Sequence, residues 1–252
     1  NLSRLASFNQ AAVVVDLIYG LPGQSVDDWR EDIRTLLSLP LDGVDLYQLN
    51  VFPGSALDKA IAAGKLPPTV PLHEQEEYFH AGVDLMKKAR SRRLSMCHWG
   101  RTSRERNFYN PLAKTRADCL HFGAGAGGVL QGYFLYNESR PEAYIESCKN
   151  GKKPVTIGVT PPKELAAMRL ILEQMEECRL HLGELHEAFA GTALEGLDAS
   201  ACFAPLLDNW EAAGLIERDD AWVELTPAGQ FWQVNLTRAL LGWQRLISKE
   251  SE

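Results

Sequence analysis

The 252-residue sequence predicts an α/β fold followed by a mainly helical α+β domain with a winged-helix pattern. Three observations support this prediction. The apolar, β-branched run at 11–18 enters a Gly/Pro turn and an amphipathic helix, and a second apolar strand follows at 44–51, which is the order of a βαβ unit. Beyond residue 162 the apolar positions recur at helical spacing. Near the end, a helix, a Gly-Leu-Ile segment, a charged turn, a strand and a Thr-Pro helix start are together typical of a winged helix-turn-helix.

Ser25 is a natural helix cap, Asp27 and Asp28 suit the first turn of the helix, and Pro40 ends it. Further helices are expected at about 56–63, 72–92, 141–149, 164–178, 182–189, 201–213 and from 228, and further strands at 94–99, 118–122, 132–136 and 222–225. Residues 151–162 have the composition of a linker. The expected parts are therefore 1–93, 94–150 and 151–252.

Net charge, apolar runs and cysteine spacing indicate which partners and which cellular compartment to expect. A net charge of −7 disfavours a nucleic-acid partner, and the winged-helix segment 201–244 carries only Arg218 and Arg238 as basic residues. The sequence has no apolar run of about 18 residues and no signal-peptide pattern, so we expect a cytoplasmic protein with no membrane partner. The cysteines are widely spaced and form no CxxC pair, and we expect them to be reduced and mostly buried: Cys97, Cys119, Cys148, Cys178 and Cys202.

The segment Asp16–Ser25 joins a buried strand to a helix start, which is a common ligand-binding corner in parallel α/β proteins. The Asp16 carboxylate can accept hydrogen bonds from ribose or amino groups, and the backbone at Ile18 can meet an adenine edge. Gly20 and Gly23 let the main chain approach a ligand closely. The alternative is that this segment binds no ligand and that its glycines and proline only give the turn its shape.

A basic segment follows. Residues 87–116 contain ten Lys or Arg and a single acid, Glu105, which suggests a local site for an anion. Arginines bind carboxylates with two parallel hydrogen bonds, and aromatic rings cover a flat ligand. His98 suits an axial iron ligand or a proton donor. The candidate substrate-binding residues are His98, Trp99, Arg101, Arg104, Arg106 and Tyr109. The alternative is a solvated basic loop with a hydrogen-bonded histidine.

The glycine-rich run 123–128 allows a tight backbone turn, but no Lys-Ser/Thr pair follows it, so it is not a P-loop. Close packing is the expected role.

Five segments carry a family resemblance: DLIYGLPGQ at 16–24, VDLYQLNVFPGSAL at 44–57, HWGRTSRERNFYN at 98–110, FGAGAGG at 122–128 and VELTPAG at 223–229. In these segments the chain resembles radical-SAM proteins of the anaerobic coproporphyrinogen III oxidase type, and it is most similar to the haem-utilisation (HutW/ChuW-like) branch. The resemblance implies the C-terminal part of a radical-SAM, partial TIM-type barrel. It also implies that Asp16, Ile18, Gly20, Gly23, Asn50 and Phe52 lie at the site for S-adenosylmethionine.

The resemblance further implies anaerobic haem degradation, with methylation by S-adenosylmethionine, ring opening and iron release. Haem or a related porphyrin and an electron donor are the implied partners. Sister branches decarboxylate coproporphyrinogen III or carry haem, so an oxygen-independent coproporphyrinogen III oxidase and a non-catalytic haem chaperone stay open as alternatives. A DNA-binding regulator is a third and weaker alternative.

The family's CxxxCxxC motif is absent from the sequence. The cysteines that hold a [4Fe–4S] cluster are therefore expected upstream, in a full-length protein, and no metal site is expected in this chain. The chain alone is expected to be inactive, and its sequence does not identify catalytic residues.

Overall fold

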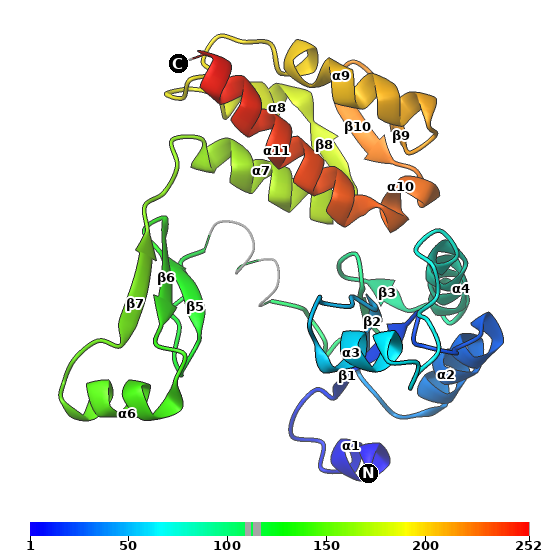
Figure 1. Cartoon of the computed structure of the whole chain (residues 1–252). Helices are drawn as coiled ribbons and strands as arrows, with labels where there is room; N and C mark the ends of the chain where they lie inside the picture. Colours follow the sequence, from blue (N-terminus) through cyan, green and yellow to red (C-terminus); the bar gives the residue numbers. More distant parts are fainter. Residues whose placement is uncertain (109–111, 113–116, 252) are drawn as a thin grey trace. The chain divides into compact units, whose positions relative to one another are not determined.

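The computed structural model describes residues 1–108, 112 and 117–251 of the chain. It divides into two compact units, Asn1–Asn107 and Phe108–Glu252 (Figure 1). The division of the chain into three parts stays a prediction.

The first unit is built around a four-stranded sheet with the strand order β1-β2-β4-β3. Strand β1 (Val14–Tyr19) pairs in parallel with β2 (Gly43–Gln48), and helix α2 (Val26–Ser38) connects them, so the predicted βαβ unit is confirmed. Strand β4 (His98–Gly100) runs antiparallel to β2, and β3 (Arg92–Arg93) runs antiparallel to β4.

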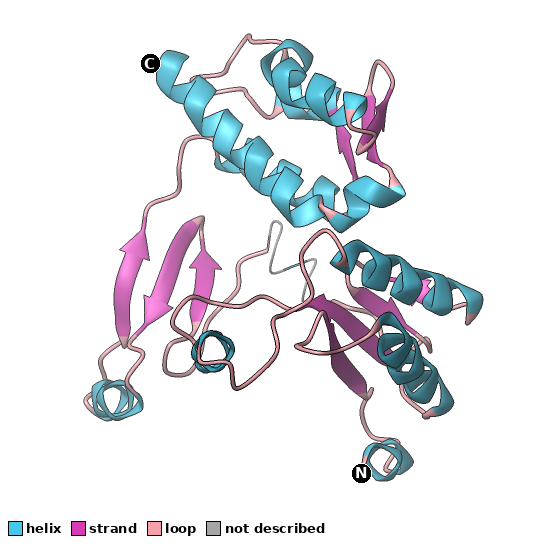
Figure 2. Ribbon diagram, turned by 45° about the vertical axis from the view of Figure 1, so that its right-hand side comes forward, coloured by secondary structure: helices cyan, strands magenta, loops and turns pink. Residues whose placement is uncertain are grey.

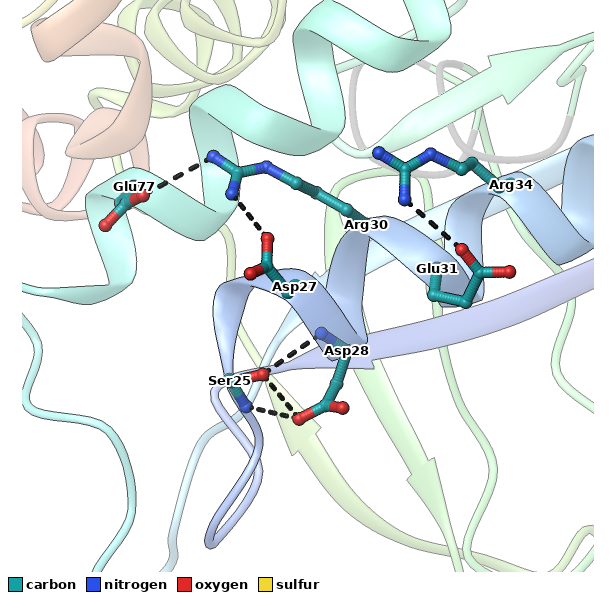
Figure 3. Close-up of polar contacts among 7 residues, drawn as sticks. All are labelled: Ser25, Asp27, Asp28, Arg30, Glu31, Arg34 and Glu77. Atoms are coloured by element: carbon teal, nitrogen blue, oxygen red, sulfur yellow. Dashed lines mark hydrogen bonds and ion pairs between the residues drawn. The ribbon is translucent and has the colours of Figure 1, made fainter.

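Helix α2 begins at a complete capping box (Figure 3). The Ser25 hydroxyl accepts a hydrogen bond from the Asp28 amide at 3.1 Å, and the Asp28 carboxylate accepts one from the Ser25 amide at 2.9 Å. Arg30 of α2 also reaches Glu77 of helix α4 (Gln75–Lys88) at 3.5 Å. Because this ion pair is exposed, the cap rather than the pair fixes where α2 starts.

Helices α2 and α4 lie side by side on one face of this sheet (Figure 2). Their apolar faces meet Val44 and Trp99 of the sheet in one core that contains Trp29, Ile33 and Met86. The buried Trp29 indole donates a hydrogen bond to the Tyr78 carbonyl at 2.8 Å, which ties the two helices together. This core covers one face of the sheet.

The remaining elements of this unit are helices α1 (Leu2–Ser7) and α3 (Ala56–Ala62). Helix α4 ends four residues before the predicted position, because Arg90 takes a left-handed conformation with φ of 57°. The expected strand at 94–99 is wrong in its extent, since the chain turns there and pairs only at β3 and β4.

The second unit begins with an antiparallel sheet in the order β5-β6-β7, formed by β5 (Gly127–Leu130), β6 (Tyr133–Asn137) and β7 (Val155–Val159). Helix α6 (Pro141–Lys149) lies between β6 and β7 in the sequence and confirms the predicted helix.

Two sequence predictions in this region are wrong. The expected linker at 151–162 contains β7, because its β-branched residues pair with β6 despite the prolines on either side. The expected strand at 118–122 is reduced to one isolated bridge between Cys119 and Val129.

The rest of the second unit has the element order and the β8-β10-β9 sheet of a winged helix, as predicted. Its elements are α7 (Leu165–Glu176), β8 (Arg179–His181), α8 (Leu182–Glu187), α9 (Ala199–Ala212), β9 (Ile216–Arg218), β10 (Trp222–Leu225), α10 (Pro227–Phe231) and α11 (Gln233–Ser251). Thr226 caps α10 by accepting a hydrogen bond from the Gly229 amide at 3.1 Å. Strand β8 is the element that the sequence pattern did not reveal.

The five cysteines are free, as expected, but they are not mostly buried: Cys148 is exposed and the others are partly exposed. In the part of the chain that the structure describes, we find no helix with the length and apolar character needed to cross a membrane.

Candidate functional site

The candidate site is the face of the first sheet that points away from helices α2 and α4. Side chains alternate between the two faces of a strand. On β1, Val15 and Leu17 belong to the helix-side core, so Asp16 and Ile18 point the other way. By the same alternation, β2 and β4 present further residues there. We define the site face by five residues: Asp16, Ile18, Asp45, Tyr47 and His98.

The strand register arranges these residues in two rows. Asp16 pairs with Asp45 across β1 and β2, and Asp45 pairs with His98 across β2 and β4. The next row, toward the carboxyl ends of the parallel strands, contains Ile18 opposite Tyr47. Their side chains are open, with Ile18 42% and Tyr47 39% exposed. Barrel enzymes bind their ligands at this end of the strands.

His98 is buried between two carboxylates. Its Nδ1 lies 2.8 Å from Asp45 Oδ2, and its Nε2 lies 3.3 Å from Glu105 Oε1. Only 5% of His98 and 6% of Asp45 is exposed. The hydrogen bond with Asp45 raises the pKa of His98 above its usual value; burial opposes this shift, and the charges of Asp45 and Glu105 add to it. The two carboxylates therefore favour the protonated form of the imidazole.

Glu105 reaches His98 because the segment 101–107 folds back over the sheet. A Cβ on Gly43 would lie 3.0 Å from Glu105 Cγ, and Gly43 pairs with another glycine, Gly100 of β4. The two glycines leave room for the returning carboxylate. The Asn107 amide donates to Glu105 Oε1 at 2.6 Å, which fixes the carboxylate in that position.

Two further side chains, Cys97 and Tyr47, lie near Asp45. The Cys97 thiol donates to Asp45 Oδ1 at 3.5 Å. Burial, together with the negative charges of Asp45 and Asp16, raises the pKa of Tyr47 to about 12. The phenol therefore keeps its proton at neutral pH. Sequence analysis missed Tyr47, although the alternation along β2 was enough to place it beside Ile18.

The arginines of the basic segment make contacts within the chain. Arg101 donates to the carbonyl oxygens of Leu36 at 3.2 Å, Leu37 at 2.8 Å and Leu39 at 2.7 Å, at the end of α2. Arg104 donates to Asn9 Oδ1 at 2.5 Å and to the Ala11 carbonyl at 2.8 Å. These contacts favour a structural role for Arg101 and Arg104.

The other predicted substrate-side residues are placed differently. Trp99 is 1% exposed and belongs to the helix-side core, with the Arg93 guanidinium 5.4 Å from its ring centre. Tyr109 lies outside the described residues. Both ring nitrogens of His98 face carboxylates, which favours a proton donor over an iron ligand. A role for Arg106 in binding a substrate carboxylate stays a prediction.

The glycine turn after β1 has a local structural explanation. Gly20 and Gly23 have φ angles of 83° and 76°, which favour glycine. A Cβ on Gly20 would also lie 2.9 Å from the buried Gln75 amide. The loop after β2 carries Asn50 and Phe52, both exposed, with Phe52 at 72%. A cofactor role for these four residues stays a prediction.

The two expected cofactors fit this chain differently. An exposed carboxylate at Asp16 and an exposed apolar side chain at Ile18 match the ribose and adenine of S-adenosylmethionine. No group of three His, Cys, Asp or Glu residues in the described ranges is placed to hold a metal ion, so these residues do not fit an iron–sulfur cluster.

Comparison with known proteins identifies relatives of this chain. The chain is 38% identical over 240 residues to anaerobilin synthase from Escherichia coli O157:H7, over 95% of this chain and 51% of that protein. Its structure matches a solved coproporphyrinogen III oxidase, HemN from Escherichia coli, described as a radical SAM enzyme, with a TM-score of 0.74 and 17% identity over 94% of this chain and 56% of the other. Over almost its whole length, the chain is thus similar to proteins of the radical-SAM, coproporphyrinogen III oxidase-like family.

Other members of this family are also similar to the chain. An oxygen-independent coproporphyrinogen III oxidase from Synechocystis is 27% identical over 90% of this chain and 51% of that protein. The heme chaperone HemW from Bacillus subtilis is 26% identical over 91% of this chain and 59% of that protein. The chain thus spans about half the length of the curated relatives it matches. No protein-family profile matches it.

Proposed function

We propose that this chain forms one side of the S-adenosylmethionine and substrate site of a radical-SAM protein that degrades haem anaerobically. The reaction includes methylation, ring opening and iron release. The observation that carries the proposal is the site face, where Asp16 is exposed in the middle of parallel strand β1 and Ile18 is exposed near the carboxyl end of that strand. The higher identity to anaerobilin synthase than to the coproporphyrinogen oxidases favours haem as the substrate.

The other relatives suggest two alternative functions for the whole protein. It would be either an oxygen-independent coproporphyrinogen III oxidase or a haem chaperone without turnover. Anaerobic incubation with haem separates them: a linear tetrapyrrole with free iron supports haem degradation, and tight haem binding without a product supports the chaperone. Conversion of coproporphyrinogen III, but not of haem, supports the oxidase.

We further propose that a one-electron donor serves the iron–sulfur cluster and that the protein is cytoplasmic. A nucleic-acid partner is not part of the proposal, because the winged-helix segment is poor in basic residues.

The cluster itself provides one prediction. The full-length protein, reconstituted anaerobically with iron and sulfide, is expected to hold a [4Fe–4S] cluster, whereas the 252-residue chain holds none, because it has no CxxxCxxC motif. Iron and acid-labile sulfide are measured on both proteins. A stoichiometric cluster on the chain alone would show that the proposal is wrong.

Asp16 provides a second prediction. Changing Asp16 to alanine in the full-length protein is expected to weaken S-adenosylmethionine binding by about 1.5–3 kcal/mol, because one hydrogen bond to a charged acceptor is lost. This corresponds to a factor of roughly 10–150 in Kd. Calorimetric titration measures the change.

The matched control for Asp16 is Asp27→Ala, which removes a carboxylate whose side chain is 89% exposed on α2, away from the site face. Its affinity is expected to equal that of the wild type. If Asp16→Ala also binds with wild-type affinity, Asp16 is not a cofactor ligand.

A further inference from the structure

We propose that the sheet of β5, β6 and β7 carries a further binding face for haem, on which the Nε2 atom of His121 binds the iron. This sheet belongs to the second unit and contains no residue of the site face. The inference rests on the proposed function in one respect, because it takes an iron-containing tetrapyrrole as the ligand.

The first observation concerns the six histidines of the chain. Five of them have a ring nitrogen beside a hydrogen-bond or ion-pair partner: His73, His80, His98, His181 and His186. In the part of the chain that the structure describes, the ring of His121 has no such partner. Its Nδ1 is buried, which leaves Nε2 as the outward nitrogen. A neutral imidazole with a free nitrogen is a common protein ligand of haem iron.

His121 lies over strand β5 because Gly128 of that strand has no side chain. A Cβ on Gly128 would lie 2.7 Å from His121 Nδ1 and 2.3 Å from the Cys119 carbonyl oxygen. Backbone contacts hold the segment there. Cys119 forms a bridge to β5, and the Asn137 amide group donates to the carbonyl oxygens of His121 at 3.5 Å and Gly123 at 3.0 Å. The position of the imidazole is therefore built from both sides.

The same arrangement suits the proton of an iron-bound imidazole. When Nε2 binds iron, the ring proton must lie on Nδ1, which then needs an acceptor. The Cys119 carbonyl oxygen shares the space over Gly128 with Nδ1. A carbonyl oxygen can accept two hydrogen bonds, and the Val129 amide donates one here, at 3.1 Å. The Nδ1–H can donate the other. Iron at Nε2 would thus pair a buried nitrogen that has no partner within the fold.

The sheet around His121 offers an apolar surface (Figure 1). The strand register places Gly128, Leu135 and Gly158 in one row on the same face, with Leu130 and Tyr133 in the next row. Leu130 is 39% and Tyr133 is 46% exposed, and these side chains belong to neither hydrophobic core of the described chain. A Cβ on Gly158 would meet only a Leu135 methyl group, at 3.6 Å, so a ligand can approach the backbone closely there.

Two lysines supply positive charge for the carboxylates of haem. Lys152 and Lys153 precede β7 and are exposed, and we find no ion pair for either within the described ranges. They lie at the end of the sheet that carries His121, because the next residue accepts a hydrogen bond from the Glu138 amide at 2.8 Å. The Glu138 carboxylate is itself paired with Arg140 at 3.2 Å. An iron ligand, an apolar surface and free positive charge together fit haem.

The test uses the 252-residue chain without a histidine tag. It is titrated with ferric haem and, as the iron-free probe, with protoporphyrin IX, and the Soret absorption reports both affinity and histidine ligation. We expect His121→Ala to weaken haem binding tenfold or more and to remove the absorption signature of a histidine ligand. Protoporphyrin IX is expected to bind this variant within twofold of the wild type, because it has no iron. Circular dichroism checks that the variant is folded.

Matched controls are available within the chain. His73→Ala removes an imidazole that is 80% exposed in the first unit, and haem affinity is expected to stay within twofold of the wild type. The double change Lys152→Gln and Lys153→Gln is expected to weaken haem and protoporphyrin IX alike, because both ligands carry carboxylates. The corresponding pair on α4, Lys87→Gln and Lys88→Gln, is also exposed and is expected to change neither affinity.

The outcomes separate this inference from the proposed function. If the wild-type chain does not bind haem, or if His121→Ala binds it as the wild type does, the inference is overturned. Equal losses for haem and protoporphyrin IX in His121→Ala also overturn it, because the imidazole then packs against the ligand without binding iron. The proposed function is judged on the full-length protein, where the absence of a linear tetrapyrrole product would overturn that function. A histidine signature that is lost in His121→Ala would still support the haem face.

Discussion

Replacement of His98 by alanine is expected to lower the free energy of unfolding by about 3–5 kcal/mol, because it leaves two buried carboxylates without their cation. The side chains of Asp45 and Glu105 are only 9% and 13% exposed, so water cannot take over the role of the imidazolium. Denaturant unfolding of the full-length protein measures the loss. His80→Ala is the matched control, since His80 and its partner Glu76 are 35% and 41% exposed and their pair contributes little.

The loss of unfolding free energy in His98→Ala should become smaller as the pH rises. The pKa of His98 is raised in the folded protein, so the stabilisation from its charge is fully present below its unfolded pKa of about 6.5. It disappears as the pH rises through the folded value. The difference between wild type and His98→Ala should therefore be larger at pH 6 than at pH 10. A difference that does not change with pH would mean that His98 is not charged in the folded protein.

The second large effect is expected at Gly229, in the VELTPAG segment. A Cβ on this residue would lie 1.9 Å from the Leu215 carbonyl oxygen, which belongs to the backbone and cannot move aside alone. Because α10 must shift away from β9, we expect Gly229→Ala to destabilise the winged-helix part by about 3 kcal/mol or more. Thermal unfolding followed by circular dichroism measures the change.

Gly242 of α11 offers a matched control, because no atom lies within 4 Å of the position where its Cβ would be. Alanine there is expected to be neutral or to stabilise by about 0.5–1 kcal/mol through its helix propensity. Equal effects of Gly229→Ala and Gly242→Ala would contradict the close packing of α10.

Much of the fold could be predicted from local pattern. The capping box at Ser25, the βαβ spacing and the Thr226-Pro227 helix start each depend on neighbouring residues, and the structure confirms them. Strands β3, β5, β7 and β8 were missed because their formation depends on pairing with other strands. Strand β7 lies between prolines and pairs with β6, and β8 has only three residues and pairs with β10.

The candidate site was predictable only in part. The DLIYGLPGQ segment correctly predicted a strand that enters a glycine turn, with Ile18 near its carboxyl end and Asp16 two residues earlier. The spacing of charges in the basic segment did not reveal the partners of its side chains. Arg101 binds helix carbonyls more than sixty residues earlier in the chain, and His98 finds Asp45 across the sheet. Such pairings depend on strand register and on the returning segment, which no local spacing encodes.

The contacts of Arg101 also have a mechanical consequence. Its guanidinium joins the segment after β4 to the last carbonyls of α2, and the other end of α2 starts at Ser25, just after the glycine turn. With 13 residues, the helix is a stiff rod about 20 Å long. Arg101 therefore fixes the position of the segment after β4 relative to the same rigid helix that begins beside the glycine turn.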